Sequence, residues 1–161
     1  MSLKDWLVRF KAQHEQARTG TLSGDGLDDY RAGRDELARA LIGAQVAALK
    51  SGETARQALR VARALQADLE WSVDRVRVVT QDLSSGGFSA LLTKAPPTDE
   101  DVKVKLRLPG AEVLDARARV VGAHMQPSAV RVSFAFTGMG PADRDKLEFL
   151  VFDTVLQQMK I

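Results

Sequence analysis

Two short groups of polar residues near the middle of the chain can recognise phosphate and guanine. Arg56 and Arg60 stand four residues apart, and Asp82, Ser84 and Gly87 follow further along the chain. An arginine guanidinium pairs bidentately with a phosphate or with the O6/N7 edge of guanine, and it can stack on a base. A carboxylate accepts hydrogen bonds from the Watson–Crick edge of guanine, a serine hydroxyl donates or accepts, and a glycine permits close backbone approach. These five residues are therefore the candidate ligand-binding residues.

The remaining polar residues form no recognisable catalytic or metal-binding group. The sequence contains no cysteine and two histidines, which excludes thiol nucleophiles, cysteine-ligated zinc and iron–sulfur clusters. His14 falls on the apolar face of an expected helix and His124 lies between expected strands, so we expect structural roles for both. Carboxylate pairs such as Asp28 and Asp29 are expected to cap a helix or face solvent. We therefore expect no enzyme activity, no metal and no cofactor.

The composition is that of a globular chain with an almost balanced charge. Of the 161 residues, 45% are hydrophobic and 27% are charged, and the formal net charge is +2. So mild a charge, with few aromatic residues for base stacking, disfavours nucleic acid as the main partner. No uninterrupted apolar run suits a signal peptide or a membrane span, so we expect a cytoplasmic protein without membrane insertion.

The first 53 residues are expected to form a helical extension. Apolar residues recur at helical spacing from Leu3 to Ala17, behind a cap at Ser2 and Asp5. A second helix is expected from Asp25 to about Lys50, with an apolar stripe broad enough to need more than one neighbour. Residues 1–53 carry equal numbers of acidic and basic residues. Such a hairpin can pack on its own domain, self-associate or bind another protein.

The sequence after residue 60 is typical of an antiparallel β-structure. Apolar and polar residues alternate, most clearly where Val102, Val104, Leu106 and Leu108 are separated by basic residues. Six strands are expected, at residues 61–71, 75–80, 88–93, 102–108, 113–121 and 130–136. A C-terminal helix is expected from Pro141, because proline is favoured at the first helical position. The pattern indicates an α+β fold with a small barrel or sandwich.

The two polar groups together resemble the signature of the PilZ domain family. That signature is R-x-x-x-R followed some twenty residues later by (D/N)-x-S-x-x-G, and its positions here are Arg56, Arg60, Asp82, Ser84 and Gly87. The resemblance covers about residues 54–161, which leaves residues 1–53 as the helical extension. It implies a six-stranded antiparallel barrel that binds cyclic di-GMP, a bacterial second messenger. Basic residues that often precede the first arginine in the family are replaced here by Thr54 and Ala55.

Each half of the signature also has a plainer interpretation. Arg56 and Arg60 can be like charges one turn apart on an exposed helix, because residues 53–65 are rich in helix formers. Asp82 and Ser84 can form a turn that bonds its own backbone. The binding interpretation is favoured because both halves occur in order at the family's spacing.

Three classes of function remain open from the sequence. The first is a cyclic di-GMP receptor that converts ligand binding into altered protein–protein contact. The second is a nucleotide-independent PilZ-like adaptor that acts only through protein partners. The third and least favoured is a small-barrel nucleic-acid binder. An unidentified protein partner, or self-association through the N-terminal helices, is expected for the first two.

Overall fold

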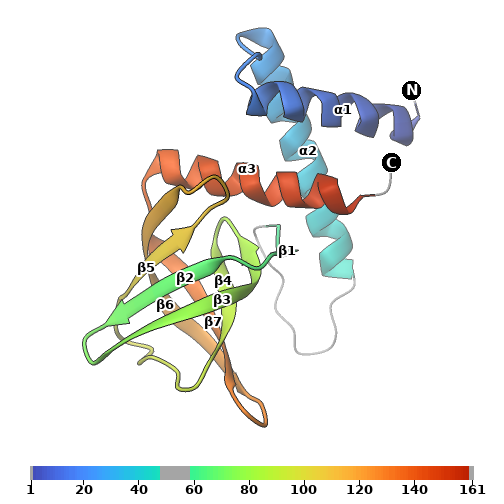
Figure 1. Ribbon diagram of the computed structural model, residues 1–161. Coiled ribbons are helices and arrows are strands. Elements are labelled where there is room, and N and C mark those ends of the chain that lie inside the picture. Colours follow the sequence, from blue (N-terminus) through green and yellow to red (C-terminus); the bar gives the residue numbers. More distant parts are fainter. Residues whose placement is uncertain (1, 48–58, 160–161) are drawn as a thin grey trace. The chain divides into compact units, whose positions relative to one another are not determined.

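The computed structural model describes residues 2–47 and 59–159, and the chain divides into two compact units. The barrel unit comprises residues 60–151. The helical unit comprises residues 1–59 and 152–161. Figure 1 labels the helices and strands, and each unit is considered by itself below.

The barrel unit is one antiparallel sheet closed on itself. Its strands are β1 (Val61–Ala62), β2 (Gln66–Trp71), β3 (Asp74–Ser84), β4 (Gly87–Leu92), β5 (Val102–Arg107), β6 (Val113–Met125) and β7 (Val130–Gly138). The sheet order is β1-β3-β2-β5-β6-β7-β4, and an additional pairing of β3 with β4 closes six strands into a barrel. The two-residue β1 lies outside this ring and pairs with β3. The expected six-stranded antiparallel barrel is confirmed, as are the N-terminal helices and the C-terminal helix α3 (Pro141–Gln158).

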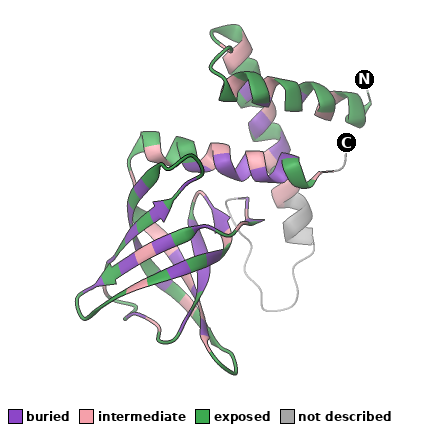
Figure 2. Ribbon diagram, in the orientation of Figure 1, coloured by how far each residue is buried: buried purple, intermediate pink, exposed green. Residues whose placement is uncertain are grey.

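Alternating side chains on most strands fill the barrel interior, and Figure 2 shows the resulting bands of buried and exposed residues. On β5, Val102, Val104 and Leu106 are buried while the intervening basic residues are exposed. Phe88 of β4 and Phe134 of β7 stack inside the barrel with ring centroids 4.8 Å apart. The period-two pattern of the sequence thus separates the inner and outer faces because successive strand side chains point in opposite directions.

The first expected strand, residues 61–71, is divided into β1 and β2, so its continuity was predicted wrongly. Thr80 of β3 accounts for the division. Its hydroxyl donates to the carbonyl of Arg63 at 2.6 Å and accepts from the amide of Leu65 at 2.9 Å. The amide of Thr80 also donates to the carbonyl of Leu65. The buried Thr80 hydroxyl therefore replaces the ladder hydrogen bonds of the Arg63 carbonyl and the Leu65 amide between the two strands. The alternation of apolar and polar residues does not reveal such a bond.

Replacing Thr80 by valine should destabilise the barrel. Valine keeps the branched shape but leaves the amide of Leu65 and the carbonyl of Arg63 without their side-chain partner, at a cost of about 1–3 kcal/mol. The measurement is the free energy of unfolding in urea. Thr137→Val, at an exposed position on β7, is the matched control and should change stability by less than about 0.5 kcal/mol. Equal effects of the two substitutions would contradict this role of Thr80.

The helical unit contains α1 (Leu3–Arg18), α2 (Asp25–Ala47) and the last turns of α3. The expected cap of α1 is confirmed, because the amide of Asp5 donates to Ser2 Oγ at 3.1 Å. Phe10 stacks between Trp6 and Tyr30, which joins α1 to α2. The expected end of the second helix near Lys50 lies outside the described residues. Within the described ranges, none of the helices is long and apolar enough to cross a membrane.

His14 connects the three helices of this unit through a buried polar network. Its Nδ1 lies 2.7 Å from the hydroxyl of Tyr30 on α2, and its Nε2 lies 3.2 Å from Oδ1 of Asp153 on α3. A carboxylate only accepts, so Nε2 carries the proton and Nδ1 accepts from the tyrosine. Arg18 also pairs with Asp153. The expectation of a structural role for His14 is therefore confirmed.

The helical unit should lose stability as the pH falls from about 6.5 towards 4. Burial, with a smaller contribution from Arg18, lowers the pKa of His14 from 6.5 to about 4. Between these pH values His14 is protonated in the unfolded chain but neutral in the folded chain. Acidification therefore lowers the free energy of unfolding by up to about 3 kcal/mol. Urea unfolding at several pH values should show a weaker pH dependence for His14→Gln than for the wild type. His124→Gln, at an exposed histidine, should retain the wild-type dependence.

Candidate functional site

Folding brings together two of the candidate residues, one from each half of the signature. Arg60 directly precedes β1, and β1 pairs with the end of β3 so that Ala62 faces Asp82. Arg60 Nη1 lies 3.5 Å from Asp82 Oδ1. The short β1 strand therefore places the arginine beside the aspartate. Arg56 lies outside the described residues.

A third residue, Arg131 of β7, completes the cluster around Asp82 and was missed by sequence reasoning. Its Nη2 donates to Asp82 Oδ2 at 2.9 Å and contacts Ser89 Oγ at 3.5 Å. Asp82 faces Ser89 on β4, and β4 separates β3 from β7, so Arg131 reaches across one strand. Its outward position in the alternating segment 130–136 was visible in the sequence. Its contact with Asp82 was not visible in the sequence, because that contact depends on the order of the strands in the sheet.

The cluster of Arg60, Asp82 and Arg131 has more positive than negative charge. The Asp82 side chain is only 14% exposed and lies between two guanidinium groups. Its Oδ1 is buried and makes no hydrogen bond in the described structure, although it lies in ion-pair range of Arg60. A guanidinium group binds phosphate oxygens bidentately, so two arginines next to one another suit a phosphate.

Ser84 is engaged by its own loop. Its hydroxyl accepts from the amide of Gly86 at 3.1 Å and donates to the carbonyl of Gly87 at 3.4 Å. The self-bonded turn that the sequence left open is thus found for Ser84, whereas Asp82 pairs with Arg60 and Arg131. Arg144, near the start of α3, donates to the carbonyl of Ser85 at 3.4 Å and ties the same loop to the helix.

Gly87 allows the backbone of β4 to approach the backbone of β7 closely, as expected for a glycine. A Cβ at this position would lie 2.0 Å from the carbonyl oxygen of Phe134. Gly87 faces Ala135 in the β4–β7 ladder and Ser84 in the β3–β4 ladder. The missing side chain therefore allows β4 to lie between β3 and β7, which is also what brings Arg131 near Asp82.

Gly87→Ala should destabilise the barrel by at least about 1–3 kcal/mol, because the added methyl group would force the β4 and β7 backbones apart. Urea unfolding measures the effect. Gly122→Ala is the matched control, since that strand glycine has nothing within 4 Å of an added Cβ. The control should leave stability unchanged or slightly raised. A Gly87→Ala chain as stable as the control would contradict the close approach.

Metal ligands do not gather in the parts of the chain that the structure describes. No group of three or more histidine, aspartate or glutamate side chains is placed to hold an ion there. The chemistry of the Asp82 cluster is that of charge and hydrogen bonding.

Comparison with known protein families identifies the domain. The family model described as the PilZ domain matches residues 54–153. This chain belongs to the PilZ domain family. The match spans β1 to β7 and most of α3, so the PilZ domain includes the whole Asp82 cluster.

Several solved structures share the fold at low sequence identity. The Bacillus subtilis inhibitor of motility (MotI/DgrA) is 16% identical with a TM-score of 0.61, and the alignment covers 67% of this chain and 55% of that one. The PilZ domain of Escherichia coli YcgR with c-di-GMP is 18% identical with a TM-score of 0.54, covering 65% and 94%. The K. pneumonia MrkH–c-di-GMP complex is 17% identical with a TM-score of 0.55, covering 65% and 54%. The alignments thus span only about half of MotI and MrkH. No curated protein matches the chain.

Proposed function

We propose that this PilZ-domain chain is a bacterial, cytoplasmic receptor for cyclic di-GMP that changes a protein–protein contact when the ligand binds. The observation that carries the proposal is the cluster at the end of β3, where Asp82 lies between the guanidinium groups of Arg60 and Arg131. PilZ membership supports the proposal, and so does the presence of c-di-GMP in the solved YcgR and MrkH complexes. On this proposal the chain acts by binding, without catalysis and without a cofactor.

The chemistry of the cluster matches the parts of a cyclic dinucleotide. The phosphates of the dinucleotide would bind the guanidinium groups of Arg60 and Arg131, and Arg56 would add a third guanidinium group. Its guanine offers N–H groups to the carboxylate of Asp82. Because Asp82 already accepts from Arg131, the ligand would exchange one set of charge-assisted hydrogen bonds for another. The arginine released from the carboxylate would then be available to a phosphate.

Ser84 and Gly87 would act mainly through the loop that carries them. The Ser84 hydroxyl holds the Gly86 amide, and Gly87 holds β4 against β7. Both keep the Asp82 backbone in place. A direct contact of Ser84 with the ligand would require its hydroxyl to leave the loop.

We further propose that residues 54–161 form the ligand-binding PilZ-like domain and that residues 1–53 form a helical extension. The extension would supply the surface through which the signal reaches a partner, either an unidentified protein or a second copy of the chain. Its balanced charge suits a protein contact better than a polyanion.

The alternative is a nucleotide-independent adaptor that acts only through protein partners. It is favoured by the self-bonded hydroxyl of Ser84 and by the pairing of Asp82 with two arginines. In an adaptor these interactions would be permanent structural bonds.

Titration calorimetry of the full chain with cyclic di-GMP separates the two functions. The wild type should bind, and Arg60→Ala and Asp82→Ala should each lose about 1–3 kcal/mol of binding free energy, roughly 5- to 150-fold in Kd. Arg131→Ala should weaken binding similarly, because it removes a cation and a partner of Asp82. Flat heats with the wild type would favour the adaptor.

Two controls keep the result specific. Arg75→Ala removes an exposed arginine that pairs with Glu70 on the outer face of the barrel, and it should bind as the wild type does. Guanosine monophosphate should bind more weakly than cyclic di-GMP, because it offers one phosphate and one base to the same cluster. An equal loss in Arg75→Ala would show that net charge, not the Asp82 cluster, determines binding.

A further inference from the structure

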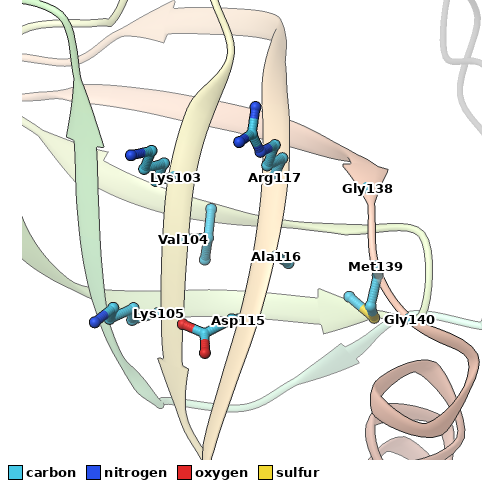
Figure 3. A pocket seen from close by; sticks show the side chains of 9 residues that line it. All are labelled: Lys103, Val104, Lys105, Asp115, Ala116, Arg117, Gly138, Met139 and Gly140. Carbon is cyan, nitrogen blue, oxygen red and sulfur yellow. The ribbon is translucent and has the colours of Figure 1, made fainter.

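The outer face of the barrel carries a second charged surface, on β5 and β6, which contribute no residue to the Asp82 cluster. In the closed ring β3-β2-β5-β6-β7-β4, the pair β5 and β6 lies opposite the pair β3 and β4. Lys103 and Lys105 of β5 and Arg117 of β6 lie on this side with Asp115, as Figure 3 shows. We call Lys103 and Arg117 the basic pair.

The two residues of the basic pair carry like charges at directly paired positions of β5 and β6. Lys103 faces Arg117 in the β5–β6 register, and like charges in that position destabilise a sheet. On its other side Arg117 faces Gly138 of β7, which offers no side chain. Lys103 faces Glu70 of β2, but that carboxylate pairs with Arg75 at 3.4 Å.

Other basic residues on these strands have acidic partners. Asp68 accepts from Arg77 at 2.8 Å and from Arg107 at 3.3 Å, and the hydrogen bond from Arg77 lowers the pKa of Asp68. Arg119 pairs with Asp101 at 2.9 Å. Lys105 faces Asp68 on one strand and Asp115 on the other. Among the described residues, Lys103, Lys105 and Arg117 thus carry the positive charge of this face that no ion pair offsets, and Lys103 and Arg117 face each other.

A hollow of about 370 Å³ adjoins the basic pair. Its lining includes both residues of the pair, the backbone of Gly138 and Gly140, and the partly buried side chain of Met139. The site thus offers positive charge beside an apolar side chain and accessible backbone. A carboxylate could contact Lys103 and Arg117 while a neighbouring aliphatic side chain contacts Met139.

We propose that this surface binds an acidic segment of a partner protein, with carboxylates next to an aliphatic side chain. Charge complementarity is the argument for the occupant, because an anion would remove the repulsion of the basic pair. A polynucleotide is disfavoured because its phosphates recur on every nucleotide and would also face Asp68, Glu70 and Asp115, whereas a protein segment can separate its carboxylates with neutral residues. The inference does not rest on cyclic di-GMP binding.

The test uses the full chain and a labelled synthetic peptide of repeated Glu-Glu-Leu triplets. Fluorescence anisotropy should show binding that weakens with added salt, and amide shifts should map it to β5, β6 and residues 138–140. Lys103→Glu with Arg117→Glu should weaken binding at least about tenfold. The matched control, Lys4→Glu with Lys11→Glu, makes the same change in net charge at exposed residues of α1 and should bind as the wild type does.

Three results would overturn the proposal. They are equal losses in the two double variants, amide shifts that lie away from β5 and β6, and tighter binding of a single-stranded DNA oligonucleotide at the same residues. A stability measurement provides an independent check. Arg117→Glu alone converts the like-charge contact with Lys103 into an opposite-charge one, so the melting temperature should rise by about 1–4 °C while peptide binding falls. A fall in melting temperature would contradict the assigned repulsion.

Discussion

Closure of the barrel is the constraint on which the rest of the PilZ domain depends. β4 must pair with β3 on one edge and with β7 on the other, and the missing side chain of Gly87 makes the second pairing sterically possible. Closure gives the end of β3 a strand partner in β4, so the backbone groups paired there are satisfied within the ring. It also places the end of β3 one strand away from β7. The residues of the candidate site meet for this reason.

The Asp82 cluster is a direct product of that closure. Asp82 of β3 provides the carboxylate. Arg60 lies beside it because β1, which follows Arg60, pairs with the end of β3. Arg131 of β7 extends across β4 to the same carboxylate. No two of these three residues are close in sequence. A buried carboxylate between two guanidinium groups is stable without a ligand, yet it can exchange partners with an anion that brings its own donors. The cluster thereby suits a reversible switch.

The two sides of the barrel use charge differently. At β3, β4 and β7 the arginines are arranged around an acidic residue. At β5 and β6, Lys103 and Arg117 face each other without one. Both arrangements favour an incoming anion, but the first is partly buried and the second is open. Since they use different residues, a small ligand and a protein segment could bind at the same time.

Local interactions explain what the sequence by itself determined. Alternation on β5 set the inner and outer faces, Ser2 and Asp5 set the start of α1, and the spacing of the signature residues pointed to the PilZ family. The tertiary structure decided the rest. It divided residues 61–71 into two strands through Thr80, engaged Ser84 in its own loop, and brought Arg131 to Asp82. These contacts depend on strand order and register, which result from the packing of the whole barrel and cannot be deduced from the periodicity of any one segment.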